Sequence, residues 1–130
     1  MAGISKGAAG EVIAARFLRE HGYDILAVNA RSRLGEVDII ATDATYIVFV
    51  EVKTRGEHDL TESPKETVTR DKQEKIKKTA MLYLQRHKTK LQPRFDVIEI
   101  VTSAGDAPLA AKRIDHLKNA FETGDLRAAF

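Results

Sequence analysis

Two strongly apolar segments near the middle of the chain carry charged residues at their ends. Asp38 precedes Ile39 and Ile40, and the run Ile47–Val50 precedes Glu51 and Lys53. β-branched and aromatic residues of this kind are typical of buried strands, where an uncompensated carboxylate loses much of its hydration energy. The chain must therefore fold so that partners reach these charges, and the two partners to weigh are a divalent cation and an internal ion pair.

Length and composition predict one globular domain over residues 1–130. The chain is 43% hydrophobic and 31% charged, which is ordinary for a soluble domain of this size. It has no cysteine, which excludes disulfides and cysteine-bound zinc and favours a reducing, cytoplasmic location. The apolar start from Met1 to Leu18 is interrupted by Glu11 and Arg16, so we interpret it as a helix rather than a signal peptide and expect no membrane association.

Hydrophobic spacing predicts the order helix, three strands, helix, strand, helix. The expected elements are a helix from Ser5 to His21, strands Tyr23–Ala30, Glu36–Thr42 and Tyr46–Lys53, an exposed loop Thr54–Ser63, a helix from a Thr69 cap to His87, a strand Arg94–Thr102 and a terminal helix Arg113–Phe121. A long helix between the third and fourth strands favours a crossover onto the same sheet. The expected fold class is therefore α/β, as a three-layer α/β/α domain with a mixed sheet.

The two central strands are expected to form an antiparallel hairpin. If Asp43 and Ala44 are its two turn residues, Asp38 lies opposite Phe49 and Glu36 lies opposite Glu51. In that register Glu36, Asp38, Glu51 and Lys53 all lie on one face. A three-residue turn would move the first two to the other face.

Given this register, the charged residues suit phosphodiester chemistry. Asp38 and Glu51 can supply hard oxygen ligands to Mg²⁺, and the Lys53 ammonium can orient an attacking water or stabilise charge on the phosphate. Glu11 interrupts the apolar stripe of the first helix, so it can point inward and either join the cation or hold Lys53. The alternatives are a purely structural ion-pair cluster and, for Glu11, a carboxylate near a helix start.

The blocks around these residues are similar to those of the YraN family of bacterial proteins, which is related to archaeal Holliday-junction resolvases and has a restriction-endonuclease-like fold. The matching positions are Gly7, Gly10, Glu11, Ala14, Leu18, Asn29, Arg31, Gly35–Ile40, Phe49–Arg55, Lys72, Gln73, Lys75, Ile76, Ala80, Tyr83, Leu84, Arg94–Ile98, His116, Asn119, Ala120 and Phe121. The resemblance implies that Glu11, Asp38, Glu51 and Lys53 are the catalytic acids and lysine. It implies that Mg²⁺ or Mn²⁺ is the cofactor, with Glu11, Asp38 and Glu51 as ligands.

Basic residues point to an anionic partner, although the net charge is only +2. They gather between residues 65 and 90, where a solvated helix face explains the charge run alone. With the acids, the leading hypothesis is a nuclease for DNA, branched DNA in particular, with Arg31, Arg33, Arg55, Lys72 and Lys75 on phosphates. A catalytically silent nucleic-acid-binding adaptor of repair or recombination is the alternative, and a structural interaction protein is a third.

Symmetric cleavage of two DNA strands needs two active sites. Resolvases that cut symmetrically are usually homodimers for this reason, but the sequence shows no apolar seam for such an interface and leaves the oligomeric state open. Gln73 and Tyr83 loosely match a glutamine and a tyrosine that some relatives carry on the helix after the lysine strand. Packing of that helix is the role we favour for both.

Overall fold

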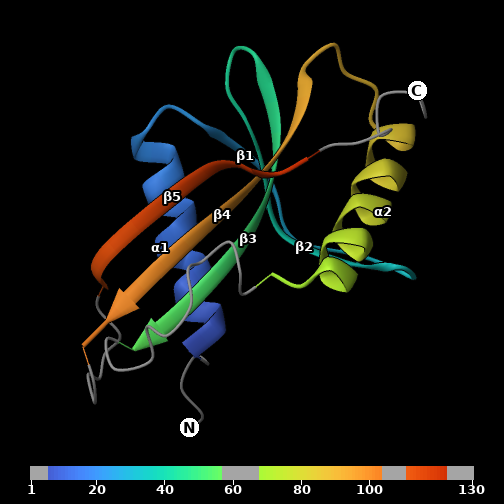
Figure 1. Ribbon diagram of the computed structural model, residues 1–130. Helices are drawn as coiled ribbons and strands as arrows, with labels where there is room; N and C mark the ends of the chain where they lie inside the picture. The colour runs from blue at the N-terminus through green and yellow to red at the C-terminus, as the bar shows by residue number, and fades with distance from the viewer. Residues whose placement is uncertain (1–5, 57–67, 104–110, 123–130) are drawn as a thin grey trace, which may run out of the picture.

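The computed structural model describes residues 6–56, 68–103 and 111–122, which form helices around one sheet (Figure 1). In chain order the elements are α1 (Lys6–Glu20), β1 (Asp24–Ser32), β2 (Gly35–Thr42), β3 (Tyr46–Gly56), α2 (Arg70–Arg86), β4 (Gln92–Thr102) and β5 (Ala111–Phe121). The loop predicted over Thr54–Ser63 is wrong at its start, because β3 continues to Gly56. Its remainder lies outside the described residues.

The strands lie side by side in chain order, β1-β2-β3-β4-β5. Neighbouring strands are antiparallel except β3 and β4, which are parallel. Parallel neighbours need a crossover, and α2 is the element between them. The predicted mixed sheet is therefore confirmed.

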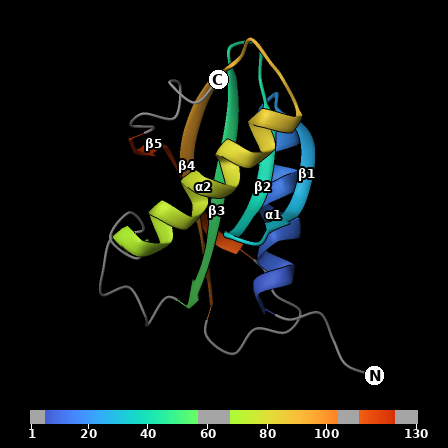
Figure 2. The same cartoon turned by 90° about the vertical axis from the view of Figure 1, so that its right-hand side faces the viewer.

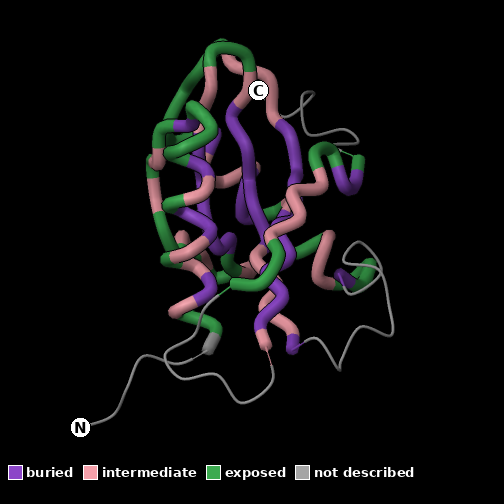
Figure 3. Tube along the Cα trace, turned by 90° about the vertical axis from the view of Figure 1, so that its left-hand side faces the viewer, coloured by how far each residue is buried: buried purple, intermediate pink, exposed green. Residues whose placement is uncertain are grey.

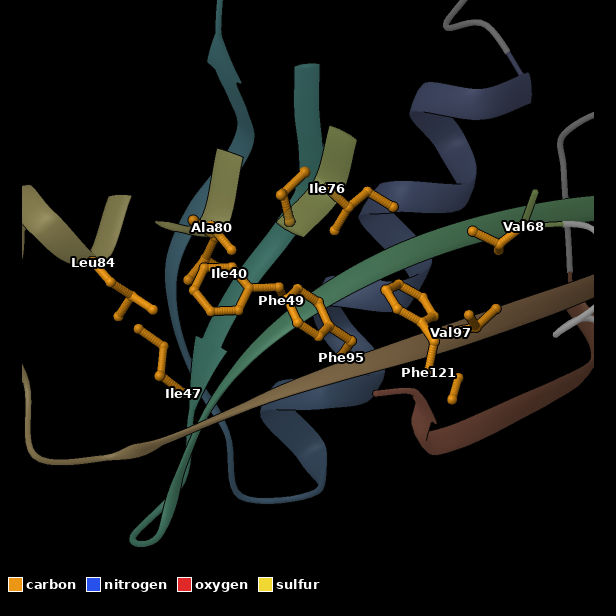
Figure 4. Packing of buried hydrophobic residues seen from close by; sticks show 12 residues of the cluster. Ile40, Ile47, Phe49, Val68, Ile76, Ala80, Leu84, Phe95, Val97 and Phe121 are labelled. Carbon is orange, nitrogen blue, oxygen red and sulfur yellow. The ribbon is translucent and has the colours of Figure 1, made fainter. Parts of the chain in front are cut away.

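The helices cover opposite faces of the sheet and create two cores (Figure 2). Ala14 and Leu18 of α1 pack on one face, whereas Ile76 and Ala80 of α2 pack on the other against Phe49 (Figure 4). Covering on both sides leaves the central strands buried over most of their length (Figure 3). The three-layer α/β/α architecture is confirmed.

Local signals set two of the helix ends, and the first is the predicted Thr69 cap. Thr69 caps α2 and its hydroxyl accepts the N–H of Lys72 at 3.2 Å, which satisfies one of the open donors of the first turn. After α1, Gly22 takes a left-handed φ of +88°, which a side chain would disfavour. These two ends fix where the first turn of α2 and the start of β1 lie.

The β2–β3 hairpin turns one residue later than predicted. Asp43 accepts the N–H of Thr45 and of Tyr46 at 2.8 and 2.7 Å, and its own N–H donates to the Tyr46 carbonyl. Ala44 and Thr45 are thus the turn residues, and Thr42 pairs with Ile47. The predicted opposition of Asp38 with Phe49 is wrong, because the Asp43 side chain organises the turn and the Asp43 N–H bonds the Tyr46 carbonyl just beyond the ladder.

The terminal segment predicted as a helix, Arg113–Phe121, is wrong, because it forms β5. Its pairing with β4 moves from Val97↔Leu117 to Phe95↔Phe121, so β5 uses four residues where β4 uses two. Asn119 within this bulge has a φ of +55°. Ile114 packs on the α1-side core and Leu117 on the α2-side core, and the bulge then places Phe121 four residues after Leu117, so the three apolar positions have a helix-like spacing.

A buried polar network joins β4 to β5 and to Tyr23, the residue just before β1. Asp96, fully buried, accepts two hydrogen bonds from the Arg94 guanidinium, at 2.9 and 2.8 Å, and one from the Asn119 N–H at 2.9 Å. His116 Nε2 lies 2.7 Å from the same carboxylate, and Arg94 also donates to the Tyr23 hydroxyl. Although burial alone would raise the pKa of Asp96, the hydrogen bonds from His116 and Arg94 lower it.

Candidate active site

The candidate site lies where β2 and β3 separate. Their paired residues end at Ile39↔Val50, although β2 extends back to Gly35 and β3 extends to Gly56. Beyond the last pair, the Asp38 carboxylate accepts the N–H of Val52 at 2.8 Å. A side-chain bond replaces a ladder bond at this point, and it fixes the Asp38 oxygens in the fork between the strands.

Glu51 and Lys53 face the α2 side of the sheet. They continue the alternation of Phe49, which belongs to the core beneath α2. Lys72 in the first turn of α2 places its ammonium 2.6 Å from Glu51 Oε1, while the Lys53 ammonium lies 3.9 Å from the same oxygen. A carboxylate that is only 3% exposed thus meets two lysines.

The regular alternation assumed for β2 does not hold at Asp38. Val37 and Ile40 both belong to the α2-side core, whereas Ile39 belongs to the α1-side core. On the neighbouring strand β1, Asn29 has a φ of +53°, which breaks that strand's alternation in the same place. The expectation that all the strand charges share one face is therefore wrong, and Asp38 sits between the two layers.

Glu11 reaches the fork from the α1 side. Its carboxyl interacts with the side chains of Asp38 and Asn29. The preceding residue, Gly10, is buried against β3, and a Cβ there would collide with the Thr54 hydroxyl. Only glycine permits this approach of α1 to β3, so Gly10 determines how close Glu11 comes to Asp38.

The three acids have more negative charge than the neighbouring groups offset. Burial raises the pKa of Glu11, and the Asp38 charge raises it further. Burial and Asp38 likewise raise the pKa of Glu51, with Lys72 opposing them. A raised pKa means that the ionised form of the carboxyl is destabilised here. A bound cation would stabilise that ionised form.

The two lysines differ in their electrostatic state. Burial lowers the pKa of Lys53, and the nearby Lys72 ammonium lowers it further. Burial alone would lower the pKa of Lys72 too, but the hydrogen bond and charge of Glu51 raise it. Lys72 is therefore the main ion-pair partner of Glu51. Lys53 is held less closely by Glu51, so its ammonium is the one available to a substrate.

The basic residues expected on phosphates occupy different surroundings. Arg55 forms a 2.6 Å ion pair with Glu99 and is 13% exposed, whereas Arg31 and Lys75 form exposed pairs with Glu36 and Asp71. Arg33 is exposed and makes no ion pair within the described ranges. Lys72, expected on phosphate, lies instead on Glu51.

Sequence reasoning missed three features of the site. Glu99 is 1% exposed and pairs across the parallel ladder with Lys53; a lone acid in the apolar run Val97–Val101 was the available signal. Asn29 lies beside Glu11 through a strand irregularity that no periodicity predicts. The Lys72 contact with Glu51 depends on how α2 crosses the sheet, so spacing alone does not disclose it.

The donor set fits a hard divalent cation with few protein ligands. Among residues 6–56, 68–103 and 111–122, no three His, Asp or Glu side chains are grouped so that they hold an ion by themselves. Mg²⁺, however, is commonly held by one or two carboxylates, with waters and substrate phosphate oxygens completing its octahedron. Asp38 and Glu51 are buried, close enough to interact, and incompletely neutralised, so they are the pair that would hold it.

A mixed sheet covered by helices, with acids and a lysine at the fork of two strands, is consistent with the restriction-endonuclease-like class of α/β domains. Comparison with known proteins gives the family. A profile described as "Uncharacterised protein family UPF0102" matches residues 10–100, so the chain belongs to this family. UPF0102 is the YraN family, so the family identification made from the sequence blocks is confirmed.

Curated relatives extend over most of the chain. A UPF0102 protein of Clostridium botulinum (strain Loch Maree / Type A3) is 46% identical over 118 residues, which cover 89% of this chain and 93% of the relative. A UPF0102 protein of Nocardia farcinica is 45% identical over 116 residues, covering 88% of this chain and 87% of the relative.

Within the described ranges, neither helix is long and apolar enough to cross a membrane.

Proposed function

We propose that the protein is a Mg²⁺- or Mn²⁺-dependent nuclease that hydrolyses phosphodiester bonds in DNA, with branched or junction DNA as its preferred substrate. The observation that carries the proposal is the meeting of Asp38 and Glu51 at the fork, 8% and 3% exposed, with Glu11 beside them. Burial raises the pKa of Glu51 and of Glu11, and acids in this state with a lysine at their side are typical of catalytic sites. A cluster kept only for structure would be better neutralised.

Each residue then has a defined part. When bound, a divalent cation polarises a phosphoryl oxygen and lowers the pKa of a coordinated water. Asp38, fixed by the Val52 N–H, and Glu51 would hold that cation in place. Lys53 would donate hydrogen bonds to the attacking water or to the charge that develops on the phosphate, and its lowered pKa eases proton exchange with that water.

Glu11 would be a positioning residue that acts through Asp38. Its carboxyl interacts with Asp38 and has no direct part in the pairing of Glu51 with the lysines. It would keep the Asp38 oxygens oriented and add negative charge that favours cation binding. Loss of Glu11 should therefore weaken metal binding more than it slows a metal-saturated reaction.

The second candidate is a catalytically silent DNA-binding adaptor. The observation that favours it is the 2.6 Å contact of Lys72 with Glu51, because an ammonium there can replace a cation as the partner of that acid. An adaptor would bind DNA with the same affinity with and without a divalent cation and would leave the strands intact.

The direct test is cleavage of plasmid, flap and four-way-junction DNA in Mg²⁺ and in Mn²⁺. Wild type should cut, whereas Asp38→Asn and Lys53→Ala should lose cutting by roughly a hundredfold or more while remaining folded. Asp24→Asn, which removes an exposed carboxylate on β1, is the matched control and should cut normally. Intact DNA with wild-type protein under all these conditions contradicts the nuclease proposal.

A thermal-shift titration tests the metal separately from the chemistry. Ligands that bind only the folded state raise its melting temperature with concentration. Mg²⁺ or Mn²⁺ should therefore raise the melting temperature of wild type and of Lys53→Ala, but not of Asp38→Asn. An equal shift in wild type and both variants would mean that the cation binds elsewhere.

A further inference from the structure

A cavity of about 470 Å³ lies between the end of β1 and the C-terminal half of α2. The side chains that give it chemical character are Arg31, Arg33, Tyr83, Arg86 and His87. None of its lining residues is acidic. It is separate from the candidate active site, whose acids do not line it.

The cavity concentrates positive charge that other described residues leave uncompensated. Arg31 forms an ion pair with Glu36 at 3.4 Å, but within the described part of the chain Arg33 and Arg86 pair with no carboxylate. The partial negative charge at the C-terminal end of α2 stabilises Arg86, and this effect is enough to explain an arginine at that position. It does not explain why Arg33, from a different part of the chain, lines the same cavity. Converging guanidiniums without acids are the usual arrangement for a phosphate.

An aromatic surface adjoins this charge. The rings of Tyr83 and His87 stack with centroids 4.2 Å apart. Tyr83 also makes an edge-to-face contact with the core residue Phe49, with ring centroids 6.2 Å apart. His87 is exposed, so the stack is open to further partners on one side. Nucleic-acid bases stack on such rings.

The cavity walls are fixed to one another. Ser32 and Thr79 share a hydrogen bond of 2.9 Å between β1 and α2. Gly35, with a φ of +154°, lies so close to α2 that a Cβ would come within 3.0 Å of the Lys75 side chain. The two walls therefore keep a fixed separation, which sets the distance between the backbone positions that carry Arg33 and Arg86.

A second hollow lies at the other end of α2, next to the acids. It is lined by Gly35, Glu36, Asp71, Lys72, Lys75 and Ile76, and Lys72 also contacts Glu51. The helical rise places Tyr83 about 16 Å beyond Lys72 along α2. In a stacked DNA strand, about 16 Å corresponds to roughly five nucleotides.

We propose that the cavity binds one nucleotide unit of a DNA strand, its phosphate on Arg33 and Arg86 and its base against the Tyr83–His87 stack. The site would hold the substrate a few nucleotides from the bond at the acidic fork. This placement rests on the proposed nuclease function, whereas the binding itself does not. Substrate held at two separated points would set the distance between a DNA end or branch and the cut.

The test measures the affinity of fluorescently labelled single-stranded DNA by anisotropy in EDTA, where no metal-dependent cleavage occurs. The double variant Arg33→Ala/Arg86→Ala should bind about tenfold more weakly, and its log K against log salt should flatten by one to two contacts at about 0.7 each. Arg16→Ala/Arg19→Ala removes two exposed arginines from α1 and should bind nearly as wild type does. Equal losses in both double variants would overturn the proposal, because they would reflect net charge alone.

Two further arms test the base and the source of the nucleotide. Tyr83→Leu, with its melting temperature checked because Tyr83 also contacts Phe49, should weaken binding of the oligonucleotide but not of a matched abasic strand. Free dAMP should compete only at far higher concentration than the oligonucleotide, and equal affinities would overturn the assignment to a strand. Wild type that binds through this cavity but never cuts would refute the nuclease function alone, and cutting with unchanged Arg33→Ala/Arg86→Ala affinity would refute this site alone.

Discussion

Two polar clusters built on buried carboxylates have opposite electrostatic states in this small domain. Asp96, at the β4–β5 edge, receives hydrogen bonds from Arg94 and the Asn119 N–H and meets His116, and its pKa is lowered. At the β2–β3 fork, burial and mutual repulsion raise the pKa of Glu11 and Glu51. The first cluster is complete within the described residues, whereas the second calls for added positive charge.

The difference indicates what each cluster is for. A buried carboxylate that is fully hydrogen-bonded holds neighbouring strands together, and removing it leaves its cationic partners buried and unpaired. An incompletely neutralised cluster lowers the stability of the fold, so its retention is better explained by function. Asp38 and Glu51 are buried, as Asp96 is, so burial alone does not distinguish a structural carboxylate from a functional one.

The largest expected effect is from Asp96→Asn. This change leaves Arg94 without its ionic partner in the core and should lower the free energy of unfolding by about 3–5 kcal/mol. Urea denaturation at neutral pH measures it. Asp115→Asn, whose carboxylate is 40% exposed and pairs with Arg113, should cost less than about 1 kcal/mol. Similar losses in the two variants would remove the distinction that we draw for Asp96.

Gly10→Ala should have the next largest effect, about 1–3 kcal/mol of destabilisation from the forced separation of α1 and β3. The same change should reduce cleavage, because Glu11 moves with the helix. Gly7→Ala is the matched control on the same helix, with nothing within 4 Å of the added Cβ. There the better helix propensity of alanine should leave the protein unchanged or up to about 1 kcal/mol more stable. If both alanines behave alike, close approach at Gly10 does not position Glu11.

Glu11→Gln should have a smaller effect on stability, and of opposite sign to Asp96→Asn. Removing one charge from the repelling acids should leave the free energy of unfolding unchanged or raise it by up to about 1 kcal/mol at neutral pH. The apparent affinity for Mg²⁺, measured by thermal shift, should fall. Glu20→Gln, an exposed change on the same helix, should alter neither quantity. A clear loss of stability in Glu11→Gln would assign Glu11 a structural role.

The smallest expected effect is a pH dependence with opposite signs in the two clusters. The pKa of Glu11 and Glu51 is raised above the ordinary 4.5, so the stability they contribute is full below pH 4.5 and is lost as pH rises through their folded values. The pKa of Asp96 is lowered from 3.8, so its contribution is full above pH 3.8 and is lost as pH falls through its folded value.

Urea denaturation of wild type and Glu11→Gln across pH measures the contribution of the fork. The stability advantage of Glu11→Gln at neutral pH should shrink steadily as pH falls toward 4.5. An advantage that stays constant over this range would show that charge repulsion is not its source. The same series below pH 3.8 should show wild type losing stability as Asp96 becomes protonated.

Most of the fold could be predicted from local sequence. Apolar spacing placed α1, β2, β3, α2 and β4 close to their observed bounds, because their buried faces repeat regularly. The failures arise where pairing partners and side chains, rather than local periodicity, set the strands. In β5 burial on both faces and the bulge at Asn119 gave a strand the spacing of a helix. At Asp43 a side chain moved the hairpin turn by one residue, and pairing with β4 extended β3 to Gly56.

The candidate residues could be selected from the sequence, but their arrangement could not. Asp38, Glu51, Lys53 and Glu11 were recognisable as charges in apolar surroundings. That Asp38 lies between layers, and that Glu11 reaches it from the opposite face to Glu51, depends on broken alternation in two neighbouring strands. Periodicity assumes regular strands, so it predicted one shared face.

The sequence by itself determined the composition of the layers and the family, because apolar periodicity and the blocks around the acids are local properties of the chain. Tertiary structure decided which charges meet. The crossing of α2 brings Lys72 to Glu51 and forms the arginine cavity with β1, and the close approach at Gly10 brings Glu11 to Asp38. These contacts join residues far apart in the chain. Their energies depend on the distances between the side chains, and those distances are fixed only when the helices pack on the sheet.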